Sequence, residues 1–179
     1  MRVLAISGSL RADSSNTSAL KAAARLAPDG MSITIFDGLA GLPYFNPDLD
    51  TDNPPNEVRA FRQDVGRSDG LLICSPEYAR GVAGVMKNAL DWLVGSFEFP
   101  GKPVALFNAS PRASHSDAQL RLTLATMAGR LVEPASIALP LLGRNLDPDG
   151  IVADAELSAQ IRQALRSFAD AIASAPAAP

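Results

Sequence analysis

Short runs of leucine and β-branched residues alternate along this chain with longer segments in which apolar residues recur at helical spacing. This alternation is typical of a parallel sheet covered by helices, because the crossover between two parallel strands usually contains a helix. The apolar runs predict strands at Val3–Ser7, Ile33–Phe36, Leu71–Cys74, Val104–Asn108 and Leu131–Ile137. The segments between them predict helices at Ser15–Leu26, Asn56–Gly66, Gly84–Val94, Asp117–Ala128 and Ala155–Ala173.

Five strands and five helices in strict alternation predict an α/β fold of the flavodoxin-like kind, a doubly wound five-stranded parallel sheet with helices on both faces. Pro134 lies within the fifth predicted strand, which is therefore expected at an edge of the sheet. The 179 residues fit a single domain, 1–179, with a frayed tail at 173–179. Ligands of such sheets bind beyond the carboxyl ends of the strands, so we expect function in the loops that follow the strands.

The charge, the cysteine content and the lengths of the apolar runs limit the kinds of partner and ligand that this chain is expected to bind. Sixteen Lys and Arg oppose nineteen Asp and Glu, a net charge of −3, and no basic run predicts nucleic-acid binding. Cys74 and His115 are the only cysteine and the only histidine, which excludes an intramolecular disulfide and a cysteine-based zinc cage. No apolar run is long enough to cross a membrane or to form a signal segment, so we expect a cytoplasmic protein with no membrane partner.

The loop after the first strand, GSLRADSSNTSAL at Gly8–Leu20, joins a buried strand to an amphipathic helix through small and hydroxyl residues. The first N–H groups of a helix are unpaired and lie at the positive end of its dipole, so this loop is a candidate phosphate cradle. The alternative is that Ser14 or Ser15 caps the helix and Arg11 is only solvated. No G-x-G-x-x-G or Walker motif is present, which favours a monophosphate. The candidate phosphate-binding side chains are Ser9, Arg11, Ser15, Asn16 and Thr17.

The loop after the third strand begins with SPEY and leads into GVMKNALDW, within Ser75–Leu93. Together with GSLRADSSN, this segment resembles the NAD(P)H-dependent FMN reductase family, which includes quinone and chromate reductases. The resemblance implies that the first loop holds the phosphate of FMN and that flavin carries the chemistry, with no catalytic side chain. It also implies that Pro76, Glu77, Tyr78 and Ala79 border the flavin ring and that Ser110 belongs to the site. Arg112 is a further candidate, for the phosphates of the nicotinamide cofactor.

The same resemblance implies an enzyme in which NADPH or NADH reduces FMN, which then reduces a small electron acceptor such as a quinone or free flavin. One opening at the sheet edge serves both substrates, so ping-pong turnover is expected. A homodimer or a dimer of dimers is implied, with the Tyr78 loop and the helix carrying Trp92 near the contact. The chain departs from the family at Ala79, where Asn is common, and at Ala83 and Gly84, where Pro-Gly is common.

Two other functions remain open on the sequence. A flavodoxin-like electron carrier would hold FMN but would not react with a nicotinamide. Cys74 and Arg80 also form C-x5-R, the spacing of a cysteine phosphatase, although Glu77 would place a carboxylate inside that loop. We expect Cys74 to be a buried strand residue and His115 a polar loop residue. Trp92 is expected in the core or at a subunit contact, and Lys87 and Asp91 as a solvated helix pair.

Overall fold

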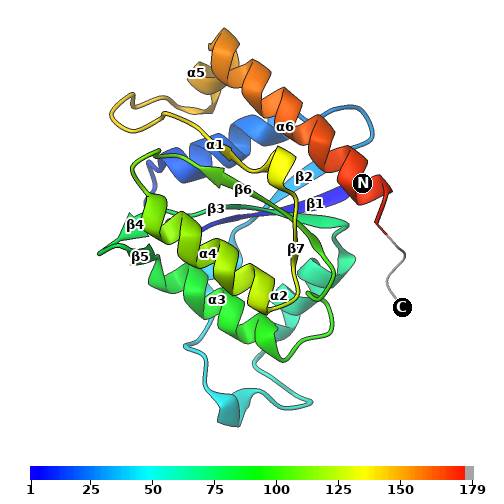
Figure 1. Cartoon of the computed structure of the whole chain (residues 1–179). Helices are drawn as coiled ribbons and strands as arrows, with labels where there is room; N and C mark the ends of the chain where they lie inside the picture. The colour runs from blue at the N-terminus through cyan, green and yellow to red at the C-terminus, as the bar shows by residue number, and fades with distance from the viewer. Residues whose placement is uncertain (176–179) are drawn as a thin grey trace.

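The computed structural model describes residues 1–175 and has a parallel sheet with the order β2-β1-β3-β6-β7, in which β8 also pairs with β6 (Figure 1). The strands of this sheet are β1 (Arg2–Ser7), β2 (Ser32–Phe36), β3 (Gly70–Cys74), β6 (Pro103–Asn108), β7 (Arg130–Leu131) and β8 (Ile137–Ala138). The helices are α1 (Ser15–Arg25), α2 (Asn56–Arg67), α3 (Gly84–Val94), α4 (Ser114–Thr126), α5 (Pro148–Ala153) and α6 (Ala155–Ala173). A two-stranded antiparallel hairpin, β4 (Glu77–Tyr78) with β5 (Gly81–Val82), lies between β3 and α3.

The predicted doubly wound fold is confirmed. Strand order reverses at β1, where the chain passes to β2 on one side and to β3 on the other. Parallel register sets Ile6 beside Ile73, and Ile73 beside Leu106, so β1, β3 and β6 end at the same edge. The loops after these three strands therefore meet at the carboxyl edge, where such sheets bind ligands.

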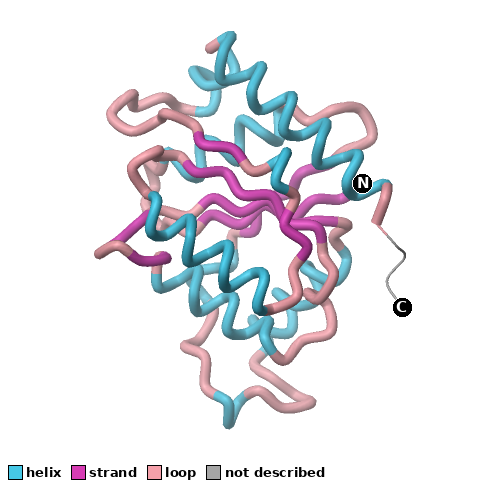
Figure 2. Tube along the Cα trace, in the orientation of Figure 1, coloured by secondary structure: helices cyan, strands magenta, loops and turns pink. Residues whose placement is uncertain are grey.

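Helices lie on both sides of the sheet (Figure 2). Alternate residues of the buried strands face two separate apolar cores. Val3 and Ala5 pack with α1 and α6, whereas Leu4 and Ile6 pack with α2 and α3. The helix predicted at Ala155–Ala173 from its apolar spacing is confirmed as α6, and the apolar residues at that spacing, Leu157, Ile161, Leu165 and Phe168, are all buried. Both faces of the sheet are thus covered, and the carboxyl edge is left for the loops.

The predicted fifth strand is wrong as a single strand. Leu131–Ile137 is divided into β7, a 3-10 turn at Glu133–Ala135, and β8. Pro134 has no N–H for a ladder, and the 3-10 turn that contains it lifts the chain off β6. The hydroxyl of Ser136 accepts a hydrogen bond from the Leu106 N–H at 3.1 Å, which satisfies the donor that the missing ladder would leave unpaired.

Other boundaries also differ from expectation. Helix α4 begins at Ser114 instead of Asp117 and ends at Thr126. Helix α5 and the β4–β5 hairpin were not expected. Of the expected frayed tail, Ala173 still belongs to α6, and residues 176–179 lie outside the described residues. Within residues 1–175, no helix has the length and apolarity needed to cross a membrane.

Candidate functional site

A cavity of about 330 Å³ opens at the carboxyl edge of the sheet, between the loops that follow β1, β3 and β6. This volume lies within the range of pockets that hold small ligands and cofactors. Of the predicted site residues, the structure brings eight together around it: Ser9, Arg11, Ser15, Asn16, Pro76, Glu77, Tyr78 and Ser110. Arg112 also lines it.

The β1–α1 loop forms one wall through the first turn of α1. Ser14 is the N-cap, and its hydroxyl accepts from the Thr17 N–H at 3.5 Å. This confirms that Ser14 caps the helix, yet Ser14 also lines the cavity, so capping and ligand binding are compatible here. The first turn, Ser15–Ser18, carries no acidic residue to neutralise the positive end of the helix dipole. The wall is therefore suited to an anion.

Two predicted residues, Thr17 and Ala79, are not among those that line the cavity in the described part of the chain. The Thr17 hydroxyl lies 2.8 Å from the hydroxyl of Ser7 at the end of β1. Ser7 in turn accepts from the Ser9 N–H at 3.4 Å. Thr17 therefore holds the loop that carries Ser9 instead of facing the cavity.

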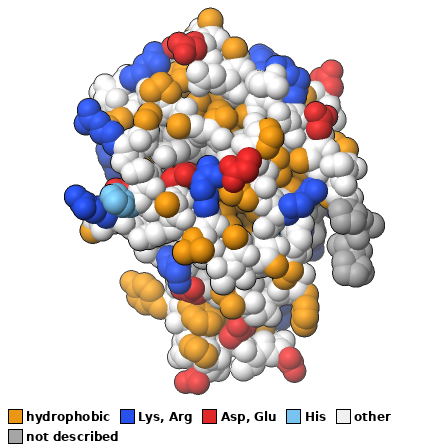
Figure 3. Space-filling view, in the orientation of Figure 1, with side chains coloured by type: hydrophobic (Ala, Val, Ile, Leu, Met, Phe, Trp, Pro, Cys, Tyr) orange, Lys and Arg blue, Asp and Glu red, His pale blue; other side chains and the backbone are white. Residues whose placement is uncertain are grey.

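Glu77 has a structural partner that its position in the sequence did not predict. Its Oε2 accepts a hydrogen bond from the Ser116 N–H, at 2.9 Å, and so caps α4, which has no cap from its own N-cap residue Ala113. This contact ties the β3–α3 segment to α4. Because Glu77 is the one acid that lines the cavity in residues 1–175, and its charge is directed at α4, Arg11 and Arg112 leave the cavity electropositive. In Figure 3, Lys and Arg side chains gather on the left edge of the molecule, the side of the hairpin in Figure 1.

Tyr78 provides the apolar part of the cavity mouth. It is 55% exposed and lies on the hairpin, while Leu142, 59% exposed, approaches from the segment after β8. The loop after β6 is held by its own residues: Asn108 accepts from the Ser110 N–H at 3.0 Å and donates to the Ala113 carbonyl at 3.3 Å. The cavity thus has a polar end at α1 and an aromatic side chain at its mouth.

The turn of the hairpin has a strained backbone. Its two central residues, Ala79 and Arg80, have φ values of 50° and 59°, as a two-residue hairpin loop of the right twist requires. Neither is Gly or Asn, the residues that adopt this region at least cost. Ala79, at a position where the family commonly has Asn, therefore makes the backbone conformation of this turn less favourable than Asn would.

We expect Arg80→Gly to raise the free energy of unfolding by about 0.5–1 kcal/mol. Glycine removes the cost of the left-handed conformation at this position, but part of that gain is lost because glycine makes the unfolded chain more flexible. Urea unfolding followed by circular dichroism measures this change. Arg80→Ala is the matched control, because it removes the guanidinium but keeps the strain. An equal rise in the free energy of unfolding of Arg80→Gly and Arg80→Ala would contradict the interpretation that backbone strain at Arg80 lowers the stability of the protein.

Cys74 does not meet the requirements of a phosphatase nucleophile, so the cysteine-phosphatase alternative is wrong. The thiol is fully buried and is not among the residues that line the cavity in the described chain, and Arg80 is exposed on the hairpin turn. Burial raises the pKa of Cys74 to about 12, whereas a nucleophilic thiol needs a lowered pKa. The expectation of a buried strand residue is confirmed.

Four further residues singled out in the sequence lie outside the cavity lining in residues 1–175. Trp92 is fully buried, and its Nε1 donates to the Pro43 carbonyl at 2.8 Å, so it is a core residue. Lys87 and Asp91 form the expected pair on α3, at 2.6 Å. His115 was expected in a loop but lies exposed in the first turn of α4, because α4 begins earlier than its apolar pattern indicates.

Several lining residues were missed by sequence reasoning: Ser14, Ser75, Asn108, Ala109, Ala113 and Leu142. Ser75 and Asn108 directly follow or end predicted strands, so the rule that placed the other residues could have found them. Leu142 follows the divided fifth strand, and no local pattern marks it. Its place depends on the path of the chain after Pro134.

Comparison with known proteins agrees with this geometry. The family profile described as NADPH-dependent FMN reductase matches residues 1–141. An NAD(P)H-dependent FMN reductase of Pseudomonas aeruginosa is 37% identical over 173 residues, covering 94% of this chain and 93% of that protein. A 2-hydroxy-1,4-benzoquinone reductase of Burkholderia sp is 42% identical over 113 residues, which is 62% of this chain and 61% of that protein.

Solved structures give the same result for the fold. A flavoenzyme NAD(P)H:(acceptor) oxidoreductase from Paracoccus denitrificans has a TM-score of 0.78 at 27% identity, covering 97% of this chain and 98% of that one. An NADH:FMN oxidoreductase in its apo form has a TM-score of 0.70 at 21% identity and supports the fold alone.

Proposed function

Since this chain belongs to the NADPH-dependent FMN reductase family, we propose that it binds FMN at the carboxyl edge of its sheet and uses NADPH or NADH to reduce small electron acceptors. The membership expected from the two sequence motifs is confirmed. The observation that carries the proposal is one cavity that has Arg11 and a helix N-terminus with no acidic residue in its first turn at one end, and Tyr78 at its mouth.

The residues present fit FMN. In our proposal, the phosphate monoester lies at the N-terminus of α1, with donors from Ser9, Ser15, Asn16 and Arg11. The flavin ring lies against Pro76 and Tyr78, next to Ser110. Thr17 supports the loop through Ser7, and Ala79 sets the turn that carries Tyr78. Glu77 contributes by fixing that segment to α4.

When bound, FMN supplies the redox chemistry by accepting a hydride from the nicotinamide and passing electrons to the acceptor. The chain contributes an electropositive entrance, at which Arg112 can meet the phosphates of the nicotinamide cofactor. The mouth beside Tyr78 and Leu142 offers apolar contact to flat acceptors such as quinones or free flavin. One mouth for both substrates supports ping-pong turnover.

Three wider expectations remain part of the proposal. Residues 1–179 act as one FMN-binding domain, since the cavity draws on loops from Ser9 to Leu142. The protein is cytoplasmic, in keeping with a single reduced cysteine. It forms a homodimer or a dimer of dimers, as the family resemblance implies, with the contact near the Tyr78 hairpin and α3. The Trp92 side chain cannot take part in it, because it is fully buried.

An anaerobic spectrum tests the function. Protein reconstituted with FMN is expected to lose its flavin absorbance at about 450 nm on addition of NADPH or NADH, and to regain it when 1,4-benzoquinone is added. FMN without protein is the control. Flavin that is bound but stays oxidised would favour the electron-carrier alternative, and a protein that binds no flavin would contradict the proposal.

A further inference from the structure

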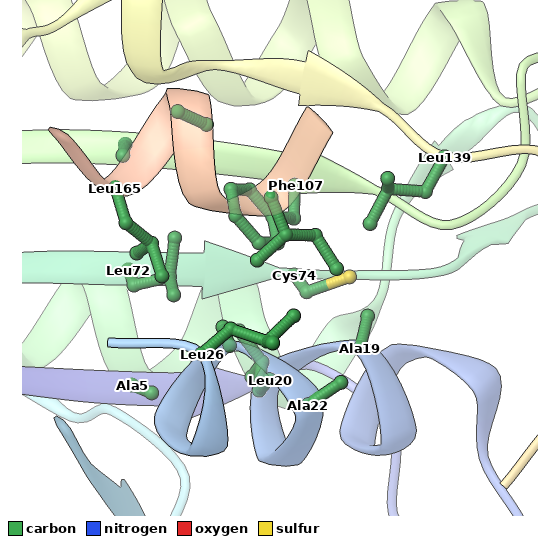
Figure 4. Packing of buried hydrophobic residues seen from close by; sticks show 14 of the residues in the cluster. Ala5, Ala19, Leu20, Ala22, Leu26, Leu72, Cys74, Phe107, Leu139 and Leu165 are labelled. Atoms are coloured by element: carbon green, nitrogen blue, oxygen red, sulfur yellow. The ribbon is translucent and has the colours of Figure 1, made fainter. Parts of the chain in front are cut away.

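Cys74 is hydrogen bonded to a residue of the cavity wall although its own side chain is fully buried. Its sulfur lies at the end of β3, between Ala19 of α1 and Leu139 (Figure 4). The Sγ donates to Oδ1 of Asn16 at 3.2 Å. Ala109, in the loop after β6, packs in the same apolar core. The buried thiol therefore joins the end of β3 to the first turn of α1, one wall of the cavity.

This hydrogen bond orients the Asn16 amide. An asparagine side chain has an accepting oxygen at one end and a donating NH₂ group at the other. The Cys74 thiol donates its proton to Oδ1, so the accepting end of the amide faces the sulfur. Nδ2 remains available to a ligand. In the reverse orientation, Oδ1 would meet an anion in the cavity and repel it.

We propose that Cys74 is a positioning residue, whose thiol holds Asn16 so that its NH₂ group donates to the phosphate of a flavin mononucleotide and favours it over uncharged riboflavin. The inference rests on the proposed function, because it assigns the anion to the phosphate monoester of FMN. It gives the buried cysteine a role in ligand selection that does not require it to touch the ligand.

A thiol suits this position for two reasons. Burial holds its pKa at about 12, so it keeps its proton and stays a donor throughout the physiological range. Its small apolar body also fits the core beside Ala19 and Phe107, where a larger polar group would be costly to bury.

Flavin titrations of the apoprotein test the proposal, with quenching of flavin fluorescence as the signal. Cys74→Val removes the donor and keeps an apolar strand residue. It is expected to weaken FMN binding by about fivefold, the worth of a modest hydrogen bond, and to change riboflavin binding by less than about twofold. Cys74→Ser keeps a donor and is expected to restore the ratio of FMN to riboflavin affinity. Leu139→Val, a packing change in the same core, is expected to leave that ratio unchanged.

A double-mutant cycle shows whether the effect passes through Asn16. In an Asn16→Ala background, Cys74→Val is expected to cause no further loss of FMN affinity. An equal loss for FMN and riboflavin, no loss for either, or an undiminished loss in the Asn16→Ala background would overturn the positioning role.

A wild-type protein that binds neither flavin would refute the proposed function, and the cradle can then be probed with inorganic phosphate alone. If phosphate raises the melting temperature of the wild-type protein but not that of Cys74→Val, Cys74 positions Asn16 for an anion other than FMN. If phosphate has no effect on the wild-type protein, both proposals fail.

Discussion

Gly8→Ala is expected to lower the free energy of unfolding by about 1–3 kcal/mol, the range for overpacking a tight site, and to weaken FMN binding at least tenfold. A Cβ at Gly8 would lie 2.3 Å from the Ser75 Oγ, 2.7 Å from the Ser75 Cβ and 3.0 Å from its Cα. The hydroxyl could rotate away, but the Cβ and Cα could not. The loops after β1 and β3 would have to separate, and both line the cavity.

The approach of these loops is held by the Gly8 N–H, which donates to the Cys74 carbonyl at 2.8 Å. Urea unfolding and an FMN titration measure the two effects. Gly84→Ala is the matched control, since in the described part of the chain no atom lies within 4 Å of a Cβ built there. A Gly8→Ala protein as stable as the wild type, with the same FMN affinity, would show that the loops do not need this contact.

Arg11→Ala is expected to weaken FMN binding by about 1.5–3 kcal/mol, the usual contribution of a hydrogen bond to a charged group. This corresponds to a roughly ten- to hundredfold higher Kd. Stability should change little, because Arg11 is exposed and makes no side-chain hydrogen bond within residues 1–175. Asn16→Ala is expected to have a smaller effect, because the backbone donors of α1 remain. Equilibrium dialysis or fluorescence titration gives the constants.

Arg112→Ala is the control for Arg11→Ala. It removes the other guanidinium of the cavity, on the loop after β6, and should raise the KM for NADPH while leaving FMN affinity unchanged. Equal losses of FMN affinity in the two variants would mean that general electropositive charge, and not a phosphate contact by Arg11, attracts the flavin.

The fold was predictable because it follows from local patterns that tertiary contacts reinforce. Helices α3 and α6 begin and end where their apolar spacing predicts, and the first four predicted strands of the sheet are present. The fifth differs because an edge strand has one partner, so Pro134 could break it into β7 and β8 without exposing the core. The sequence pattern indicates a strand at Leu131–Ile137 but does not show this break.

The site was predictable to the extent that it lies in loops directly after strands. Ser9 and Arg11 were found by that rule, and Pro76, Tyr78 and Ser110 by the family resemblance. Hydrogen bonds between distant segments could not be found in this way. The capping of α4 by Glu77 and the link from Cys74 to Asn16 join residues far apart in the chain, and no local spacing encodes them.

The central claim is that the N-terminus of α1 and Arg11 bind the phosphate of FMN. Its most direct test is the ratio of the affinities of the wild-type protein for FMN and for riboflavin, which share the ring and differ in the phosphate. The account predicts that FMN binds at least about tenfold more tightly. Equal affinities for the two flavins would contradict it.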